Sequence, residues 1–406
     1  MAGLYLLWGV DEGTVQPLFV ATPTATRGAA SYREEGTAFF EAGNLSRAID
    51  AYQDALAVNH EDYVGWTELA RIQTYSSALL TQDRKRGRLA EALASADQAV
   101  ALAPQDSSAH AVRAFVLDWT AGAAGTTTEF QTFIAEASTE AVLALQLDNL
   151  NELALAYQAE IYADQQQYTQ ASQYAELAMR VNPNSFDSLR VSAYVLEAGG
   201  NYAAAIERYK QAIQVAPNQT FVHIRIGQNY RELALYDQAL EYFDQAASIN
   251  EVLGIDDPLP YIAIARTYSR MGEFFAAALN AERAIDLDSA NPDWYGQLGI
   301  IYFRARNYES SIPVLRCAVS GCSDVQNSAD SLGRWVNSVN GLPLDNNTLA
   351  YYYTFGSVLA ALEHCGEAIP VLNALGATYP GDAVVMGIVN ESLNICEGTV
   401  ANDGDN

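Results

Sequence analysis

Residues 295–311 read YGQLGIIYFRARNYESS, and two small residues in this stretch, Gly299 and Ser311, lie twelve positions apart. Twelve residues is the offset between the two points of closest contact in a helix hairpin, where a bulky side chain would force the helices apart. Six further pairs of small residues have the same spacing: Gly36/Ala48, Ala159/Ala171, Ala193/Ala205, Gly227/Ala239, Ala265/Ala277 and Gly356/Ala368. The spacing predicts an array of helix hairpins.

The first residues of these pairs also recur along the chain. The step is 34 positions from Ala159 to Ala193, from Ala193 to Gly227, and from Ala265 to Gly299. Larger steps are explained by insertions near residues 76–86, 122–132, 253–258 and 323–348, of which the second is expected to form a loop. The array is therefore a repeat of about 34 residues with four interruptions.

The residues around the small positions carry a family resemblance. Tyr295-x2-Leu298-Gly299-x2-Tyr302 reproduces the motif W-x2-L-G-x2-Y with Tyr in place of Trp. The chain resembles the tetratricopeptide repeat family over residues 29–382. The resemblance implies an all-α, right-handed α-solenoid, or superhelix, of about nine helix hairpins, each of which buries its apolar stripe against its neighbours. Residues 383–406 are predicted to form a capping helix and a polar tail. The apolar side of that helix is expected to contain Val384, Val385, Ile388, Val389 and Leu393.

The composition restricts the partners. The formal net charge is −27 and the isoelectric point is near 4.3, so a nucleic acid or an anionic membrane surface would be repelled. Lysine occurs only at Lys85 and Lys210. This usage is compatible with an extracytoplasmic or thermophilic setting, and equally with the codon bias of a GC-rich bacterial genome. We expect a protein or peptide partner and no nucleic acid.

Residues 1–28 lie outside the array. The apolar run MAGLYLLWGV spans ten residues, fewer than the roughly 18 of a transmembrane helix, and a Thr/Pro-rich linker follows it. Two interpretations stay open: the run is the outer end of a membrane anchor that lies upstream, or it is an arm that docks into a partner or another copy. The contact residues of such an arm would be Leu4, Tyr5, Leu6, Leu7, Trp8 and Val10.

All four cysteines lie in the last 90 residues. In the repeat geometry, Cys365 in the turn of the ninth hairpin and Cys396 at the end of the capping helix meet at the same end of the array. Cys317 and Cys322 meet where Gly321 lets the chain turn back. We predict disulfides 317–322 and 365–396 and an extracytoplasmic location, at the cell surface or secreted. The alternative is four buried free thiols.

Three sequons fall in predicted turns, and Asn44, Asn218 and Asn346 are therefore glycosylation candidates, whereas Asn390 is expected to face the array. The four histidines lie in separate repeats without a partner at ligand spacing, and no catalytic or metal-binding motif is found. We predict no enzyme activity, no cofactor and no metal site.

In the tetratricopeptide family, the first helix of each repeat lines the concave face. The resemblance places its second, fifth, ninth, twelfth and thirteenth residues on that face. In repeats six to eight this partner-binding set contains Phe221, Ile224, Gln228, Arg231, Leu259, Ile262, Arg266, Arg270, Phe303 and Arg304. Four arginines suggest a pocket for an acidic segment. The alternative is that they pair with carboxylates such as Glu232 and Asp293.

Three functions remain open. The first is a non-enzymatic interaction scaffold, exported or surface-tethered, that binds a peptide or protein in its groove. The second is a structural subunit of an extracellular filament, joined head to tail through the N-terminal arm. The third is a cytoplasmic regulatory or accessory subunit.

Overall fold

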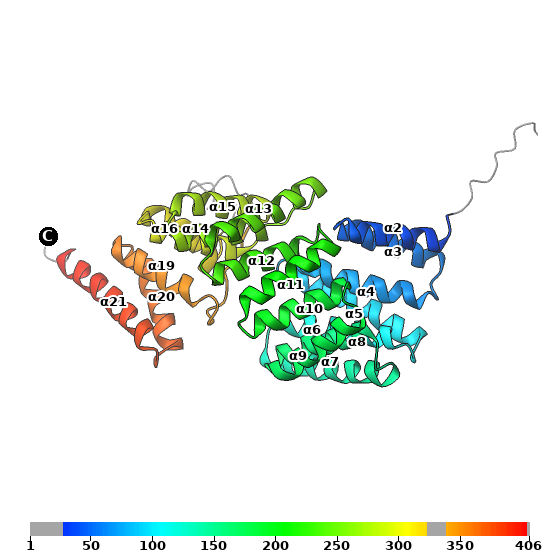
Figure 1. Cartoon of the computed structure of the whole chain (residues 1–406). Coiled ribbons are helices and arrows are strands. Elements are labelled where there is room, and N and C mark those ends of the chain that lie inside the picture. The colour runs from blue at the N-terminus through cyan, green and yellow to red at the C-terminus, as the bar shows by residue number, and fades with distance from the viewer. Residues whose placement is uncertain (1–26, 323–337, 404–406) are drawn as a thin grey trace, which may run out of the picture.

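The computed structural model describes residues 27–322 and 338–403, apart from the side chains at 82–83 and 399–403. This part of the chain contains nineteen α-helices and, besides them, one isolated bridge between Cys322 and Val339. The all-α repeat solenoid is therefore confirmed (Figure 1).

The described helices form nine consecutive hairpins and a final single helix. The hairpins are α2 (Ala29–Glu41) with α3 (Leu45–Val58), α4 (Tyr63–Ser77) with α5 (Gln82–Leu102), α6 (Ser107–Gly122) with α7 (Thr127–Leu147), α8 (Glu152–Asp164) with α9 (Tyr168–Val181), α10 (Phe186–Ala198) with α11 (Tyr202–Val215), α12 (Thr220–Glu232) with α13 (Tyr236–Leu253), α14 (Leu259–Met271) with α15 (Phe274–Leu287), α16 (Pro292–Arg304) with α17 (Tyr308–Ser320), and α19 (Leu349–Ala361) with α20 (Cys365–Thr378). The final helix is α21 (Ala383–Asp403).

The small residues that define the repeat are buried between the two helices of each hairpin. At Gly227 an added Cβ would lie 2.5 Å from the ring of Phe243, and at Gly299 it would lie 2.5 Å from Leu315. Each of these large side chains comes from the second helix of the same hairpin, sixteen residues further along the chain. The small position is therefore the recess into which a large side chain of the second helix fits.

A left-handed residue closes the turn of most hairpins. It lies at the same register position in seven of them, as Gly43, Gln166, Gly200, Ala234, Gly272, Arg306 and Glu363. At this position a positive φ lets the chain reverse between the two helices, which is why glycine occupies three of the seven.

The insertions mainly lengthen helices. The second helices α5 and α7 each have 21 residues, whereas α9 and α11 have 14. The loop expected near 122–132 is shorter than predicted, because α6 continues to Gly122 and α7 begins at Thr127. These residues extend an existing hydrogen-bonded helix, which costs less than ordering an irregular loop. Most of the 323–348 insertion lies outside the described residues.

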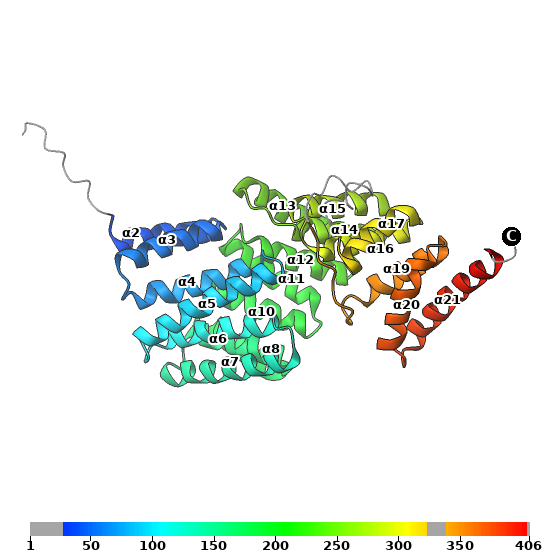
Figure 2. The same ribbon diagram turned by 180° about the vertical axis from the view of Figure 1, so that it is seen from behind.

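The superhelix closes on itself within its first six repeats. The Gln219 side chain donates a hydrogen bond to the backbone oxygen of Phe40 (2.7 Å), and Asn218 donates one to that of Ala42 (3.1 Å). The turn before α12 therefore rests on the turn after α2, about 176 to 179 residues away in the chain. Figures 1 and 2 show α2 to α12 gathered at one end of the molecule and α19 to α21 at the other.

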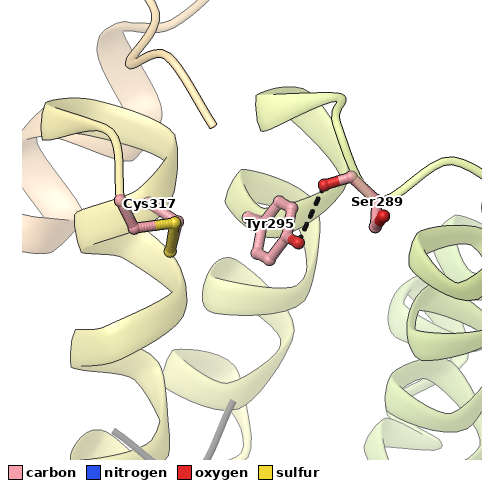
Figure 3. The surroundings of a disulfide bond; sticks show 4 residues. Ser289, Tyr295 and Cys317 are labelled. Carbon is pink, nitrogen blue, oxygen red and sulfur yellow. Dashed lines mark hydrogen bonds between the residues drawn. A yellow bond between two sulfur atoms is a disulfide. The ribbon is translucent and has the colours of Figure 1, made fainter. Parts of the chain in front are cut away.

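Both cysteine pairs that the sequence predicts are bonded in the structure, 317 with 322 and 365 with 396. Figure 3 shows Tyr295 between the first disulfide and Ser289, whose backbone oxygen accepts a hydrogen bond from the Tyr295 hydroxyl (2.9 Å). The second disulfide joins the start of α20 to α21 and thus links the last hairpin to its cap.

The capping helix buries one side only. Val385, Val389 and Cys396 are buried against the last hairpin, whereas Val384 is 72% exposed, contrary to its predicted place on the apolar side. The reason is the helical period, since 385, 389 and 396 share one face and residue 384 lies off that face. No described helix combines the length and hydropathy that a membrane-spanning segment needs.

Candidate partner-binding cavity on the inner face

The inner face of the first six repeats is filled by aromatic side chains rather than open. Tyr75 on α4 is fully buried and stacks on Phe221 of α12, with ring centroids 5.5 Å apart. Phe115 on α6 stacks in turn on Tyr157 of α8, at 4.3 Å. These rings come from repeats two, three, four and six, so the concave face of this region is a second hydrophobic core.

A buried polar network lies beside these rings. The Asp187 carboxylate on α10 accepts hydrogen bonds from the hydroxyls of Tyr75 and of Tyr157 (2.7 Å), and Arg71 donates to it at 3.0 Å. Arg190 donates two hydrogen bonds to Glu160 on α8, at 2.7 and 2.5 Å. The bidentate pair is almost fully buried and links adjacent repeats.

The network ends at a cavity of about 410 Å³ on the inner face. Most of its lining comes from the first helices of consecutive repeats, α6, α8, α10 and α12. The turn after α4, the start of α14 and one residue each of the second helices α5 (Lys85) and α11 (Tyr209) complete it. The lining residues are Ala78, Lys85, Asp118, Trp119, Gly122, Glu160, Asp164, Arg190, Tyr194, Tyr209, Phe221, Ile224, Arg225, Gln228 and Leu259.

Two carboxyl groups in this cavity have raised pKa values. Burial raises the pKa of Asp118 well above its ordinary value, and the charges of Asp164 and Glu160 raise it further. Burial also raises the pKa of Asp164 to about 6, against the opposing effect of the hydrogen bond that it accepts from the Tyr194 hydroxyl. Both shifts disfavour the charged form.

Part of the partner-binding set that the sequence predicts lies in this cavity. Phe221, Ile224, Gln228 and Leu259 line it, although Phe221 and Ile224 are mostly buried. Ile262 is only 3% exposed and belongs to the core between repeats, so its predicted role in partner contact is corrected. Phe303 lines a separate cavity of about 260 Å³ near α21.

The predicted arginine cluster is not part of the cavity. Arg270 pairs with Glu232 at 3.2 Å and Arg266 pairs with Asp293 at 3.6 Å, which is the alternative that the sequence left open. Arg304 donates a hydrogen bond to the Ser269 hydroxyl at 3.2 Å. A partner carboxylate would have to displace these existing contacts.

Arg231 differs from its three neighbours because it is half-buried. It donates to the backbone oxygen of Ala263 at 3.4 Å, and its guanidinium lies 5.7 Å from the ring centroid of Phe243. Burial, together with the charges of Arg270 and Arg266, lowers its pKa to about 10. Its immediate contacts are thus within the array.

The residues that sequence reasoning missed obey the same register rule. Counting second, fifth, ninth, twelfth and thirteenth positions in repeats three to five yields Asp118, Trp119, Glu160, Asp164 and Arg190. In repeats six to eight the same positions hold the four arginines, which are the more conspicuous signal in the sequence. The signal was therefore present in the sequence, but nothing in the sequence showed which repeats surround a cavity.

The other predicted sites have mixed outcomes. Asn346 is exposed, whereas Asn218 packs against Gly43, so a glycan on its amide nitrogen would break the contact with α2. Asn44 caps α3 by accepting a hydrogen bond from the Arg47 backbone, and Asn390 is exposed rather than facing the array. Residues 1–26, with the arm, lie outside the described residues. Within the described part, no three His, Cys, Asp or Glu side chains are grouped to hold a metal ion.

Comparison with known protein families agrees with the repeat. Two family models described as tetratricopeptide repeat match the chain, one over residues 158–220 and 262–324 and the other over residues 222–252. No curated protein matches the chain.

Several solved structures are similar to the chain at low sequence identity. The chain is similar to the Cut9–Hcn1 heterotetramer of the APC/C, with 14% identity, a TM-score of 0.50, and coverage of 97% of this chain and 82% of that one. It is also similar to a repeat protein from Parabacteroides merdae, with 18% identity, a TM-score of 0.41, and coverage of 67% and 98%. A thermophilic repeat protein from Thermus thermophilus has 17% identity, a TM-score of 0.41, and coverage of 50% and 98%.

Proposed function

The chain is a tetratricopeptide-repeat protein, a class of interaction scaffold, and on this premise we propose that it binds an extended segment of a partner protein in the inner-face cavity. Such repeats are typically non-catalytic, and the proposal includes no enzyme activity. The observation that carries it is the cavity itself, which lies on the face where solenoids bind their partners and is lined by four consecutive first helices.

The cavity has the composition of a recognition site. Apolar and aromatic walls, including Trp119 and Phe221, stand beside six charged side chains, a mixture that can select a bound side chain by both shape and charge. Its size, about 410 Å³, is enough for one or two side chains of a bound segment. The remainder of that segment would follow the inner face beyond α12, where the first helices are less crowded.

A blocked cavity tests the proposal. Gly122 lines the cavity, and an added Cβ there meets no atom within 4 Å, so Gly122→Trp fills the space without disturbing the backbone. Gly87 on α5 is exposed, is equally free of neighbours and lies outside the cavity, so Gly87→Trp is a matched control. A displayed library of random peptides would be selected on the three proteins.

We expect the wild type and Gly87→Trp to enrich the same peptide sequences and Gly122→Trp to lose them. If the wild type enriches no sequence, or if Gly122→Trp retains the same ones, the cavity is not the binding site. If the cavity binds a small molecule instead, the wild type would enrich no peptide, and the proposed function would be rejected.

We further propose that the protein works outside the cytoplasm. The two disulfide pairs support this, because disulfides persist in oxidising compartments and are rare in reducing ones. Thiol titration of the protein from its native source, under denaturing conditions without reductant, should find no free thiol. Four free thiols would favour the cytoplasmic accessory subunit instead.

A head-to-tail filament is the second candidate. It is favoured by the position of the first and last hairpins at opposite ends of the molecule, which is the arrangement that a heterologous contact needs (Figure 1). Size-exclusion chromatography with and without residues 1–28 tests it, since only the full chain should assemble. Full chains that stay monomeric at high concentration would eliminate the filament.

A further inference from the structure

Asp118 is a buried carboxyl group without a donor. The residue is 1% exposed, it lines the cavity, and no N–H or hydroxyl group of a described residue donates a hydrogen bond to either of its carboxyl oxygens. A buried carboxylate in such a position is costly unless a proton or a cation neutralises it. The structure therefore leaves an acceptor site open toward the cavity.

Asp164 on α8 is the neighbour that makes this site a pair. Both residues line the cavity, and the two carboxyl groups can hydrogen-bond one another when one of them carries a proton. Asp164 also accepts the hydrogen bond of the Tyr194 hydroxyl, which holds its carboxylate in place. Two carboxyl groups this close share a proton, because both cannot ionise without repulsion.

The other charged groups that face the pair are already occupied or are cations. Both oxygens of Glu160 bind Arg190, and one of them also accepts from Trp119 at 3.1 Å. Arg225 on α12 pairs with Glu197 on α10 at 2.9 Å.

Lys85 on α5 has Arg225 as its charged neighbour, and burial together with that like charge lowers its pKa. Burial raises the pKa of Asp164, whereas the charges of Arg190 and Arg225 lower it. The effect of burial is the larger. None of these groups supplies Asp118 with a donor.

The charges balance only if the pair keeps one proton or gains one cation. Three cations (Lys85, Arg190 and Arg225) face four carboxyl groups (Asp118, Glu160, Asp164 and Glu197). With one shared proton, three positive charges meet three negative ones. A cationic group that enters and displaces the proton leaves the sum at zero, whereas an anion would have to enter beside two carboxyl groups.

We propose that the Asp118–Asp164 pair is the subsite that receives the ammonium or guanidinium group of a Lys or Arg side chain of the bound segment. This inference rests on the proposed function and deepens it. The incoming donor hydrogen-bonds the free oxygens of Asp118, the shared proton leaves to solvent, and the stem of the side chain lies against Trp119 and Tyr194 at the cavity wall. The subsite thus selects a basic segment, the reverse of the acidic one that the arginines suggested.

Binding should depend on pH in a defined direction. The free pair holds a proton that the bound pair releases, so the affinity weakens as the pH falls. Over the range in which the free pair stays protonated, the dissociation constant should rise by up to about tenfold for each pH unit of acidification.

The first experiment uses a small probe and does not require a peptide. Capped arginine (acetyl-arginine amide) and its neutral isostere, capped citrulline, would be titrated into the full-length protein at about pH 5 and about pH 8. Asp118→Asn keeps the shape and donates to Asp164, whereas Asp50→Asn removes the same charge at an exposed site on α3. Circular dichroism would verify that both variants fold.

We expect the wild type and Asp50→Asn to bind capped arginine better at the higher pH and to bind capped citrulline at least about tenfold more weakly, while Asp118→Asn loses the discrimination. Equal binding of the two probes, or unchanged discrimination in Asp118→Asn, would overturn the subsite. If capped arginine is only attracted to the acidic surface in general, Asp118→Asn and Asp50→Asn should weaken its binding equally. That outcome would also overturn the subsite.

The peptide selection separates this inference from the proposed function. If the wild type enriches peptides with a basic residue at a fixed position and Asp118→Asn enriches peptides without one, both stand. Enriched peptides with no basic preference overturn the subsite and leave the scaffold function intact. If capped arginine binds but no peptide is enriched, the scaffold function is overturned and the acidic pair remains a binding site for a guanidinium group.

Discussion

The inner faces of repeats one to six and of repeats seven and eight are built from the same positions of the repeat but lie in different environments. In the first region the twelfth and thirteenth positions are residues such as Tyr75 and Asp118, which are buried because the superhelix closes over them. In the second region they include Arg270 and Arg304, which remain exposed.

This contrast shows that the position of a residue within the repeat determines the face on which its side chain lies. The curvature of the superhelix determines which other side chains it contacts there. First helices α4, α6, α8 and α10 pack on one another in sequence, while α14 touches α12 and α16 at only a few positions. The tighter winding of the N-terminal part converts a groove into a core. One cavity lies where that core ends, beside Asp118.

The largest expected effect is on the free energy of unfolding, and it concerns the buried inner face of the first six repeats. Arg190→Leu removes the bidentate partner of Glu160 and leaves a carboxylate buried, which should destabilise the N-terminal region by about 3 to 5 kcal/mol. Arg270→Leu removes an exposed pair and should cost under about 1 kcal/mol. Urea unfolding of both variants measures the difference, and equal midpoints would contradict the filled inner face.

The second prediction concerns how each end of the array is held. The C-terminal end relies on the 365–396 disulfide, so replacing both cysteines with serine should destabilise α20 and α21 by about 3 kcal/mol. Hydrogen exchange should then quicken in these two helices and stay unchanged in α4 to α10. A uniform increase along the chain would show that the two regions do not unfold separately.

The third prediction follows from the raised pKa of Asp118. The folded protein retains a proton that the unfolded chain releases, so the free energy of unfolding decreases as the pH rises above the ordinary carboxyl range. Asp118→Asn removes the contribution of Asp118 to this loss, although that of Asp164 stays, and it should raise the melting temperature by a few degrees at about pH 8, with little change at about pH 4. Asp50→Asn, exposed on α3, should leave the melting temperature unchanged at both pH values, and a rise like that of Asp118→Asn would point to overall charge instead.

The smallest effect compares equivalent turns in the two regions. Ala234 has a φ of 57°, so Ala234→Gly should stabilise the sixth hairpin by about 0.5 to 1 kcal/mol. Gly200 has a φ of 78° at the same register position in the fifth hairpin, and Gly200→Ala should destabilise it by a similar amount. Thermal melts of the pair would contradict the shared turn geometry if both substitutions changed the melting temperature in the same direction.

The local structure was predictable because it depends on neighbours in the sequence. Small residues such as Gly227 and Gly299 accept a side chain of the adjacent helix, and a small pair at this spacing marks seven of the nine hairpins. The pairing of Cys365 with Cys396 followed for the same reason, since the two residues lie on the successive helices α20 and α21.

The cavity was decided by contacts that no local pattern encodes. The hydrogen bond from Gln219 to Phe40 joins residues 179 positions apart, and the stacking of Tyr75 on Phe221 depends on the same closure. Closure is the sum of small rotations between successive repeats, so each repeat alone contains almost no information about it. The sequence by itself therefore determined the repeat, the turns and the disulfide pairs, whereas the tertiary structure alone decided that Asp118 and Asp164 meet in a cavity while Arg266 and Arg270 stay exposed.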